Sequence, residues 1–135
     1  MEVADMLHSA AIHLLRRLRK SDVETGLSPA RLSVLSVLVF GGGKTAGELA
    51  RIEQVRPPTM SGLIKALESE GLVNRRSHKQ DKRASMINVT ARGRRKLVNA
   101  QKLRIQNLTE LMNSMNPDEL ATLARAAQLM EGLTA

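Results

Sequence analysis

The 135-residue sequence contains no cysteine, tryptophan or tyrosine, and Phe40 is its single aromatic residue. Without cysteine the chain cannot form disulfides, thiolate zinc sites or a thiol-based redox sensor. Proteins that bind single-stranded nucleic acid usually stack the bases on aromatic side chains, so the shortage of aromatics argues against that class. The core must be built from Leu, Ile, Val, Met and Ala, a composition that suits helices.

Long apolar segments are also missing. The longest wholly apolar run, residues 37–40, is far shorter than a membrane span. The first ten residues contain acids where a secretory signal would have a basic end and an apolar stretch. We therefore expect a cytoplasmic protein with no membrane partner.

The residue patterns that enzymes use are scarce too. His8 and His13 are five apart, about 140° around a helix, and so do not have the spacing of a metal-binding helical pair. The glycine-rich run 41–44 ends a predicted helix instead of following a strand, as a phosphate-binding loop would. No convincing nucleophile and base appear together. We expect no enzyme activity, no metal and no cofactor.

The net charge of +8 is concentrated in the middle of the chain. Residues 44–96 contain 13 basic and 5 acidic side chains, whereas the segments on either side are close to neutral. Such a local excess predicts a surface that meets phosphate groups. A solvated basic face is the alternative.

Helical patterns occupy the first third of the chain. Apolar residues at three- and four-residue spacing predict a helix over 2–20, and a cluster of cations closes it. Ser28 and Pro29 predict the cap and first residue of a second helix, which is apolar almost all round and ends at the glycines 41–43. An apolar run with these valines would also permit a strand, but the cap favours a buried helix.

A helix-turn-helix pattern follows at 45–70. Thr45 and Glu48 have the spacing of a capping box and predict a short helix to about residue 52. After a turn at 53–55, a second helix is predicted from Pro57 to about residue 70, with Gly71 as its stop. The second helix of such a pair enters the DNA major groove. An ordinary helical pair with a polar exposed face is the alternative.

Residues 72–90 predict two short strands joined by a strongly charged tip. Their apolar residues tie the base of this hairpin to the core. Near the tip, Asp81 and Arg83 are two residues apart and share one side of an extended strand, so the carboxylate could orient the guanidinium. Arginine is favoured in narrow minor grooves. A weak surface salt bridge is the alternative.

Two further helices complete the chain. Thr90 is predicted to cap a long helix from 91 to about 115, along which Val98, Ile105 and Met112 form a heptad seam. Asn116 and Pro117 predict the start of a last helix. The first and last helices have more apolar surface than a monomer of this size needs.

These elements predict a mainly α fold with a small β-hairpin (α+β). A single domain spans residues 1–135. Within it, a winged helix-turn-helix part occupies 28–92, and dimerisation helices at 1–20 and 93–135 flank it. The side chains expected to contact DNA are Thr45, Arg56, Pro58, Thr59, Ser61, Gly62, Lys65, Arg75, Arg76, His78, Lys79, Asp81, Lys82 and Arg83.

Two stretches resemble the MarR (multiple-antibiotic-resistance regulator) family of bacterial winged-helix regulators. They are VRPPTMSGLIKALESEGLV at 55–73 and DKRASMINVTARG at 81–93. The resemblance implies a homodimeric, sequence-specific regulator of transcription, expected to be a repressor acting on a pseudo-palindromic operator in double-stranded DNA. It also implies that the recognition helix enters the major groove and that Arg83 enters the minor groove.

The sequence departs from the family pattern at two places. Arg56 stands where a Ser or Thr usually precedes the first proline of the recognition helix, which removes a cap worth about 1 kcal/mol. Gly62 stands where an arginine is frequent. The base preference of relatives therefore does not transfer to this chain.

Many members of that family are released from DNA by a small ligand. The candidate ligand-binding residues here are His13, Arg16 and Lys20, among the cations and histidines of the first helix. Charges that complement the helix dipole are the alternative explanation. For the whole protein, the competing function is a non-specific architectural nucleic-acid-binding protein, which would use the basic hairpin without reading bases.

Overall fold

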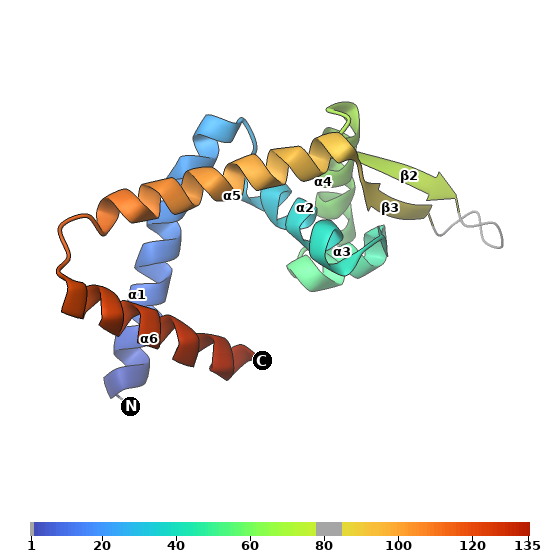
Figure 1. Ribbon diagram of the computed structural model, residues 1–135. Helices are drawn as coiled ribbons and strands as arrows, with labels where there is room; N and C mark the ends of the chain where they lie inside the picture. The colour runs from blue at the N-terminus through green and yellow to red at the C-terminus, as the bar shows by residue number, and fades with distance from the viewer. Residues whose placement is uncertain (1, 78–84) are drawn as a thin grey trace.

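The computed structural model describes residues 2–77 and 85–135 (Figure 1). The predicted mainly α fold with a small sheet is confirmed. The elements in chain order are α1 (Glu2–Arg19), the 3-10 helix η1 (Lys20–Thr25), α2 (Pro29–Gly41), β1 (Lys44–Thr45), α3 (Ala46–Glu53), α4 (Pro57–Ser69), β2 (Val73–Ser77), β3 (Ser85–Val89), α5 (Ala91–Leu111) and α6 (Pro117–Thr134).

Three features differ from the sequence predictions. A third strand, β1, pairs antiparallel with β3, so the sheet order is β1-β3-β2 and not a simple hairpin. The 3-10 helix η1 was not predicted. The long helix α5 ends at Leu111 and not near 115, because the chain turns before Asn116 caps α6.

The predicted helix caps explain where most helices begin. Ser28 accepts a hydrogen bond from the backbone N–H of Arg31 at 3.3 Å. Thr45 and Asn116 each form a complete capping box with the Glu three residues later. Each cap satisfies backbone donors that the first helical turn leaves free.

One apolar core joins α2, α3, α4, the sheet and the first half of α5. Leu35, Leu49, Met60, Ile64 and Ile87 are fully buried in it. The expectation that α2 is buried all round is wrong at its end, where Phe40 is 74% exposed. We call this compact part, residues 29–89, the winged-helix lobe.

Thr90 and Gly93 join the sheet to α5. The Thr90 hydroxyl accepts from the Gly93 N–H at 3.0 Å and donates to the Gly71 carbonyl at 2.7 Å. A side chain at Gly93 would collide with the carbonyl oxygen of Leu72 and with Val89. The absence of a Cβ there therefore allows α5 to start against the strands.

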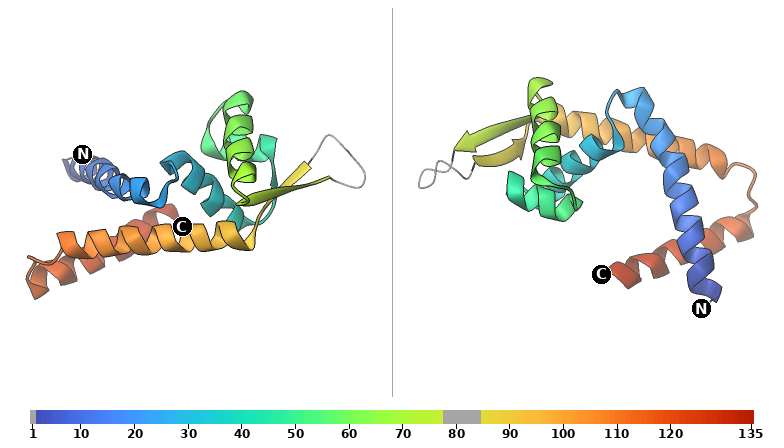
Figure 2. Two further views of the ribbon diagram at one scale, coloured as in Figure 1. Left: turned by 90° about the horizontal axis from the view of Figure 1, so that it is seen from above. Right: turned by 180° about the vertical axis from the view of Figure 1, so that it is seen from behind.

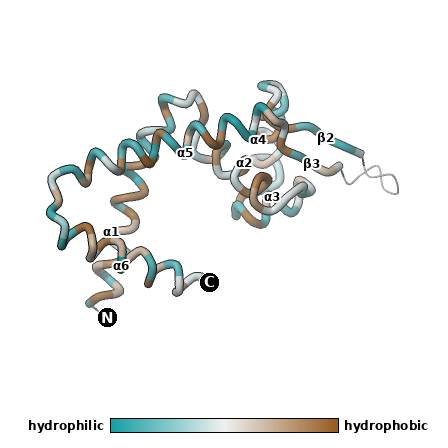
Figure 3. Tube along the Cα trace, in the orientation of Figure 1, coloured by the Kyte–Doolittle hydropathy of each residue, from teal (hydrophilic) through white to brown (hydrophobic). Residues whose placement is uncertain are grey.

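Helices α1 and α6 extend away from the lobe, at the opposite end of the molecule from the sheet (Figures 1 and 2). Neither helix has a buried residue, although both carry large apolar side chains. Coloured by hydropathy, both show apolar stretches along their length (Figure 3). Among the described residues no single helix could cross a membrane, and one pair of helices bent by 91° passes the length and composition test only jointly.

Candidate nucleic-acid interface

Helix α4 has one buried and one exposed face. Met60, Ile64 and Leu67 are fully buried, at the three- and four-residue spacing of a helical stripe. The predicted contact residues of this helix are all exposed: Arg56, Pro58, Thr59, Ser61, Gly62 and Lys65. The outer face is thus polar and cationic, and it is free to meet a ligand.

Two residues of α4 differ in an informative way from an ordinary helix. Arg56 is the N-cap and makes no side-chain capping bond, so its guanidinium is not used by the helix itself. A Cβ built at Gly62 meets no atom within 4 Å, so packing does not require glycine there. Glycine costs about 1 kcal/mol relative to alanine inside a helix. A glycine on the exposed face leaves the helix backbone open to close approach by a bound molecule.

Thr45 lies at the start of α3 and is half-buried. Its hydroxyl accepts from the Glu48 N–H at 3.2 Å, and the Glu48 carboxylate accepts from the Thr45 N–H at 3.3 Å. That backbone hydrogen bond, with the Thr45 hydroxyl next in importance, lowers the pKa of Glu48 below its usual range. Thr45 is therefore primarily a helix cap.

The cations of β2 point in different directions. Arg75 pairs with Ile87 and so shares the core-side face of the sheet, where its Nε lies 3.3 Å from Oε2 of Glu68 on α4. Arg76 pairs with Met86 on the opposite face and is exposed. The sequence prediction missed Glu68 as the partner of Arg75, because no local pattern links a helix to the following strand.

The remaining predicted DNA contacts belong to the tip of the hairpin at 72–90. They are His78, Lys79, Asp81, Lys82 and Arg83. They lie outside the described residues, and so does the expected pairing of Asp81 with Arg83.

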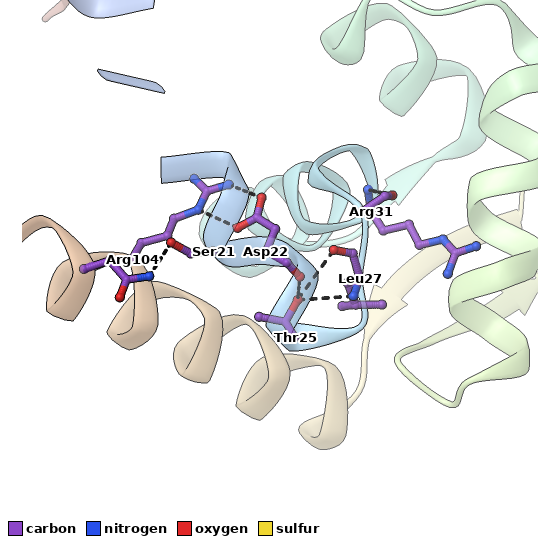
Figure 4. Close-up of polar contacts among 8 residues, drawn as sticks. Ser21, Asp22, Thr25, Leu27, Arg31 and Arg104 are labelled. Carbon is purple, nitrogen blue, oxygen red and sulfur yellow. Dashed lines mark hydrogen bonds and ion pairs between the residues drawn. The ribbon is translucent and has the colours of Figure 1, made fainter. Parts of the chain in front are cut away.

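A buried polar cluster joins η1 to α5, as Figure 4 shows. Asp22 is 1% exposed, and its two carboxylate oxygens accept from Arg104 Nε at 2.8 Å and Nη2 at 2.6 Å. Beside it, Asn107 donates to the hydroxyl of Ser21. The hydrogen bond to Asp22 raises the pKa of Arg104 further above its usual range. Sequence analysis missed this cluster, since its partners are 82 or more residues apart.

Two cavities lie near the candidate ligand residues. Lys20 lines one of about 340 Å³, with Arg17, Glu24 and Asn107. Leu15, Arg19 and Arg104 line part of another of about 240 Å³, between α1, α2 and α5. His13 and Arg16 are exposed on α1 and line neither cavity. Within residues 2–77 and 85–135, no group of three His, Cys, Asp or Glu side chains could hold a metal ion.

Comparison with known proteins gives a consistent result. The model of the MarR family matches residues 27–85. An uncharacterised HTH-type transcriptional regulator of Mycobacterium leprae is 34% identical over 95% of this chain and 90% of its own length. The HTH-type transcriptional repressor YetL of Bacillus subtilis is 28% identical over 70% of this chain and 58% of its own length.

The fold agrees with these relatives. The crystal structure of a variant of MarR from Escherichia coli superposes with a TM-score of 0.82, covers 96% of each chain and is 23% identical. Regulators of this kind are not enzymes, as the sequence predicted. The helix-turn-helix with its polar α4 face, the three-stranded wing sheet and the similarity along nearly the whole chain lead to one conclusion: the chain belongs to the MarR family of helix-turn-helix transcriptional regulators.

Proposed function

We propose that this protein is a homodimeric repressor that binds a pseudo-palindromic operator in double-stranded DNA. The observation that carries the proposal is the exposed face of α4, where polar and cationic side chains surround a glycine that packing does not require. Arginine can grip guanine with two hydrogen bonds, and Thr and Ser can donate or accept at base edges. Arg56, Thr59 and Ser61 are the side chains that we expect to contact bases.

The remaining cations are assigned to the DNA backbone and the minor groove. Lys65 lies further along the exposed face of α4, and Arg76 is exposed on the sheet. Both suit phosphate contacts, which position a protein without selecting sequence. Arg83 is the residue that we expect in the minor groove. Arg75 is paired with Glu68 through its Nε, so the two Nη groups of its guanidinium are the donors left for a phosphate.

The dimer is proposed from the apolar surface of the outer helices. On α1, Val3 and Met6 are 76% and 65% exposed, and on α5 Ile105 is 64% exposed. Helix α6 adds Leu129 and Leu133, at 56% and 75%. A second copy related by two-fold symmetry presents the same surfaces and can cover them mutually. Two lobes held in this way would meet half-sites about one DNA turn apart.

The role of repressor, release by a small ligand and location in the cytoplasm at the nucleoid complete the proposal. A relative with 28% identity is named a transcriptional repressor, which supports the first. Release by a small ligand is supported by the position of the cavity of about 240 Å³, which is lined by α1, α2 and α5 and so lies between the outer helices and the lobe.

The test is selection of duplexes from a randomised library, followed by competition with random DNA at physiological salt. A specific regulator should enrich a two-fold symmetric site and bind it at least about a thousand times more tightly than random DNA. Equal affinity for random DNA would instead favour the architectural alternative. Arg83→Ala should weaken specific binding with little change in thermal stability, and unchanged affinity would exclude Arg83 as a groove contact.

A further inference from the structure

Asp22 is the one charged side chain among the described residues that is fully buried. Burying a carboxylate costs free energy, and a pair of charges in the interior often stabilises a fold no more than apolar side chains of similar volume. Stability alone therefore does not explain why Asp22 and Arg104 stand here. A contact with two parallel hydrogen bonds fixes the relative orientation of its two partners, which apolar packing does not do.

The contact between Asp22 and Arg104 lies where the orientation of the lobe relative to the outer helices is set. Two chain segments connect the winged-helix lobe to the outer helices: η1, which leads from α1 to α2, and α5, which leads from the sheet towards α6. Asp22 is on η1 and Arg104 is on α5 (Figure 4). The two hydrogen bonds between them, with the bond from Asn107 to Ser21 one turn further along α5, fasten the two connections to each other.

We propose that Asp22 and Arg104 are positioning residues for DNA binding: their two-bond contact sets the separation and orientation of the two lobes, and thereby the half-site spacing that the dimer accepts. This inference rests on the proposed function. It assigns a part of the operator specificity that no base contact supplies to a pair remote from the recognition helix, in which Asp22 is buried and Arg104 is half-buried.

The experiment measures affinity for duplexes in which the two selected half-sites are moved apart or together by one or two base pairs. Wild-type protein should prefer one spacing sharply. Asp22→Asn and Arg104→Gln should weaken binding at that spacing about tenfold, a typical coupling for a contacting pair. Binding to the other spacings and to a duplex with a single half-site should stay within about twofold. The spacing profile becomes flat, which a general loss of stability would not produce.

Matched controls carry the same change of charge. Glu24→Gln on η1 and Lys102→Gln on α5 alter exposed side chains of the same two elements and should keep the wild-type profile. The double variant Asp22→Leu with Arg104→Met replaces the pair by apolar side chains and guards against variants that fail to fold. It should stay folded and dimeric with a flat profile.

A sharp spacing preference in the folded apolar double variant would overturn the inference and leave the proposed function intact. A profile that falls equally at every spacing and at the single half-site would also overturn it, since the pair would then act only on stability. If the wild-type protein itself shows no preference for paired half-sites, the proposed function fails and the inference fails with it.

Discussion

At the scale of single residues, Gly93 shows why α5 needs a glycine three residues after its cap, Thr90. Gly93→Ala places a methyl group against the side chain of Val89 and against the Leu72 carbonyl, which is backbone and therefore cannot rotate away. We expect a loss of about 1–3 kcal/mol in the free energy of unfolding, measured by chemical denaturation. Gly132→Ala in α6 is the matched control, because a Cβ there meets nothing and alanine should stabilise the helix slightly.

Lys65 allows a second test at this scale. If it contacts a phosphate, Lys65→Ala should weaken binding to all duplexes alike and reduce the slope of log affinity against log salt by about one. Arg125→Ala removes a cation from the exposed surface of α6 and should leave the slope unchanged. Equal slopes for Lys65→Ala and the wild type would place Lys65 outside the interface.

Glu48 offers a test by pH. Its pKa is lowered in the folded protein, so its contribution to stability is complete above the usual glutamate pKa and is lost as the pH falls through the lowered one. Glu48→Gln keeps a capping-box side chain but cannot titrate. The variant should therefore lose less stability than the wild type over that acid window, as followed by circular dichroism. If the acid unfolding curves of Glu48→Gln and the wild type ran parallel, the ionised Glu48 carboxylate would not be a source of stability.

At the scale of elements, α4 combines a sound helix with an unfavourable residue. Gly62→Ala should raise the free energy of unfolding by about 0.5–1 kcal/mol, because alanine favours the helix and the new methyl meets open space. If DNA approaches the backbone here, the same variant should bind its operator more weakly, as measured by fluorescence anisotropy. Greater stability with unchanged affinity would remove the functional explanation for Gly62.

Whether an element could be predicted from the sequence depended on whether local or distant contacts define it. Helix starts were predictable because Ser28, Thr45 and Asn116 cap them through contacts three residues away. Features built from distant segments were not. Strand β1 has two residues and exists through pairing with β3, and η1 is held by α5. For the site, the exposed face of α4 followed from helical periodicity, whereas the partner of Arg75 depended on tertiary packing.

At the scale of the whole molecule, the apolar outer helices are the feature to test. Ile105→Glu introduces a charge into the proposed dimer surface, at a side chain that is 64% exposed within one chain. Sedimentation should show a monomer with a folded lobe, because burying an unpaired carboxylate opposes association. Phe40→Glu is the control, since Phe40 is 74% exposed but lies at the end of α2. A wild-type monomer at micromolar concentration would refute the dimer.

Helix α5 has a mechanical consequence. It is one continuous helix of 21 residues, and after Gly93 it contains neither glycine nor proline, the usual causes of kinks. At 1.5 Å per residue it is a lever of about 30 Å. A tilt of roughly 6–7° about the Leu111 end of α5 would displace its Ala91 end, next to the sheet, by about 3.4 Å. That distance is the rise of one base pair. Small rotations at the end of α5 that contacts η1 would thus be magnified into whole steps along DNA.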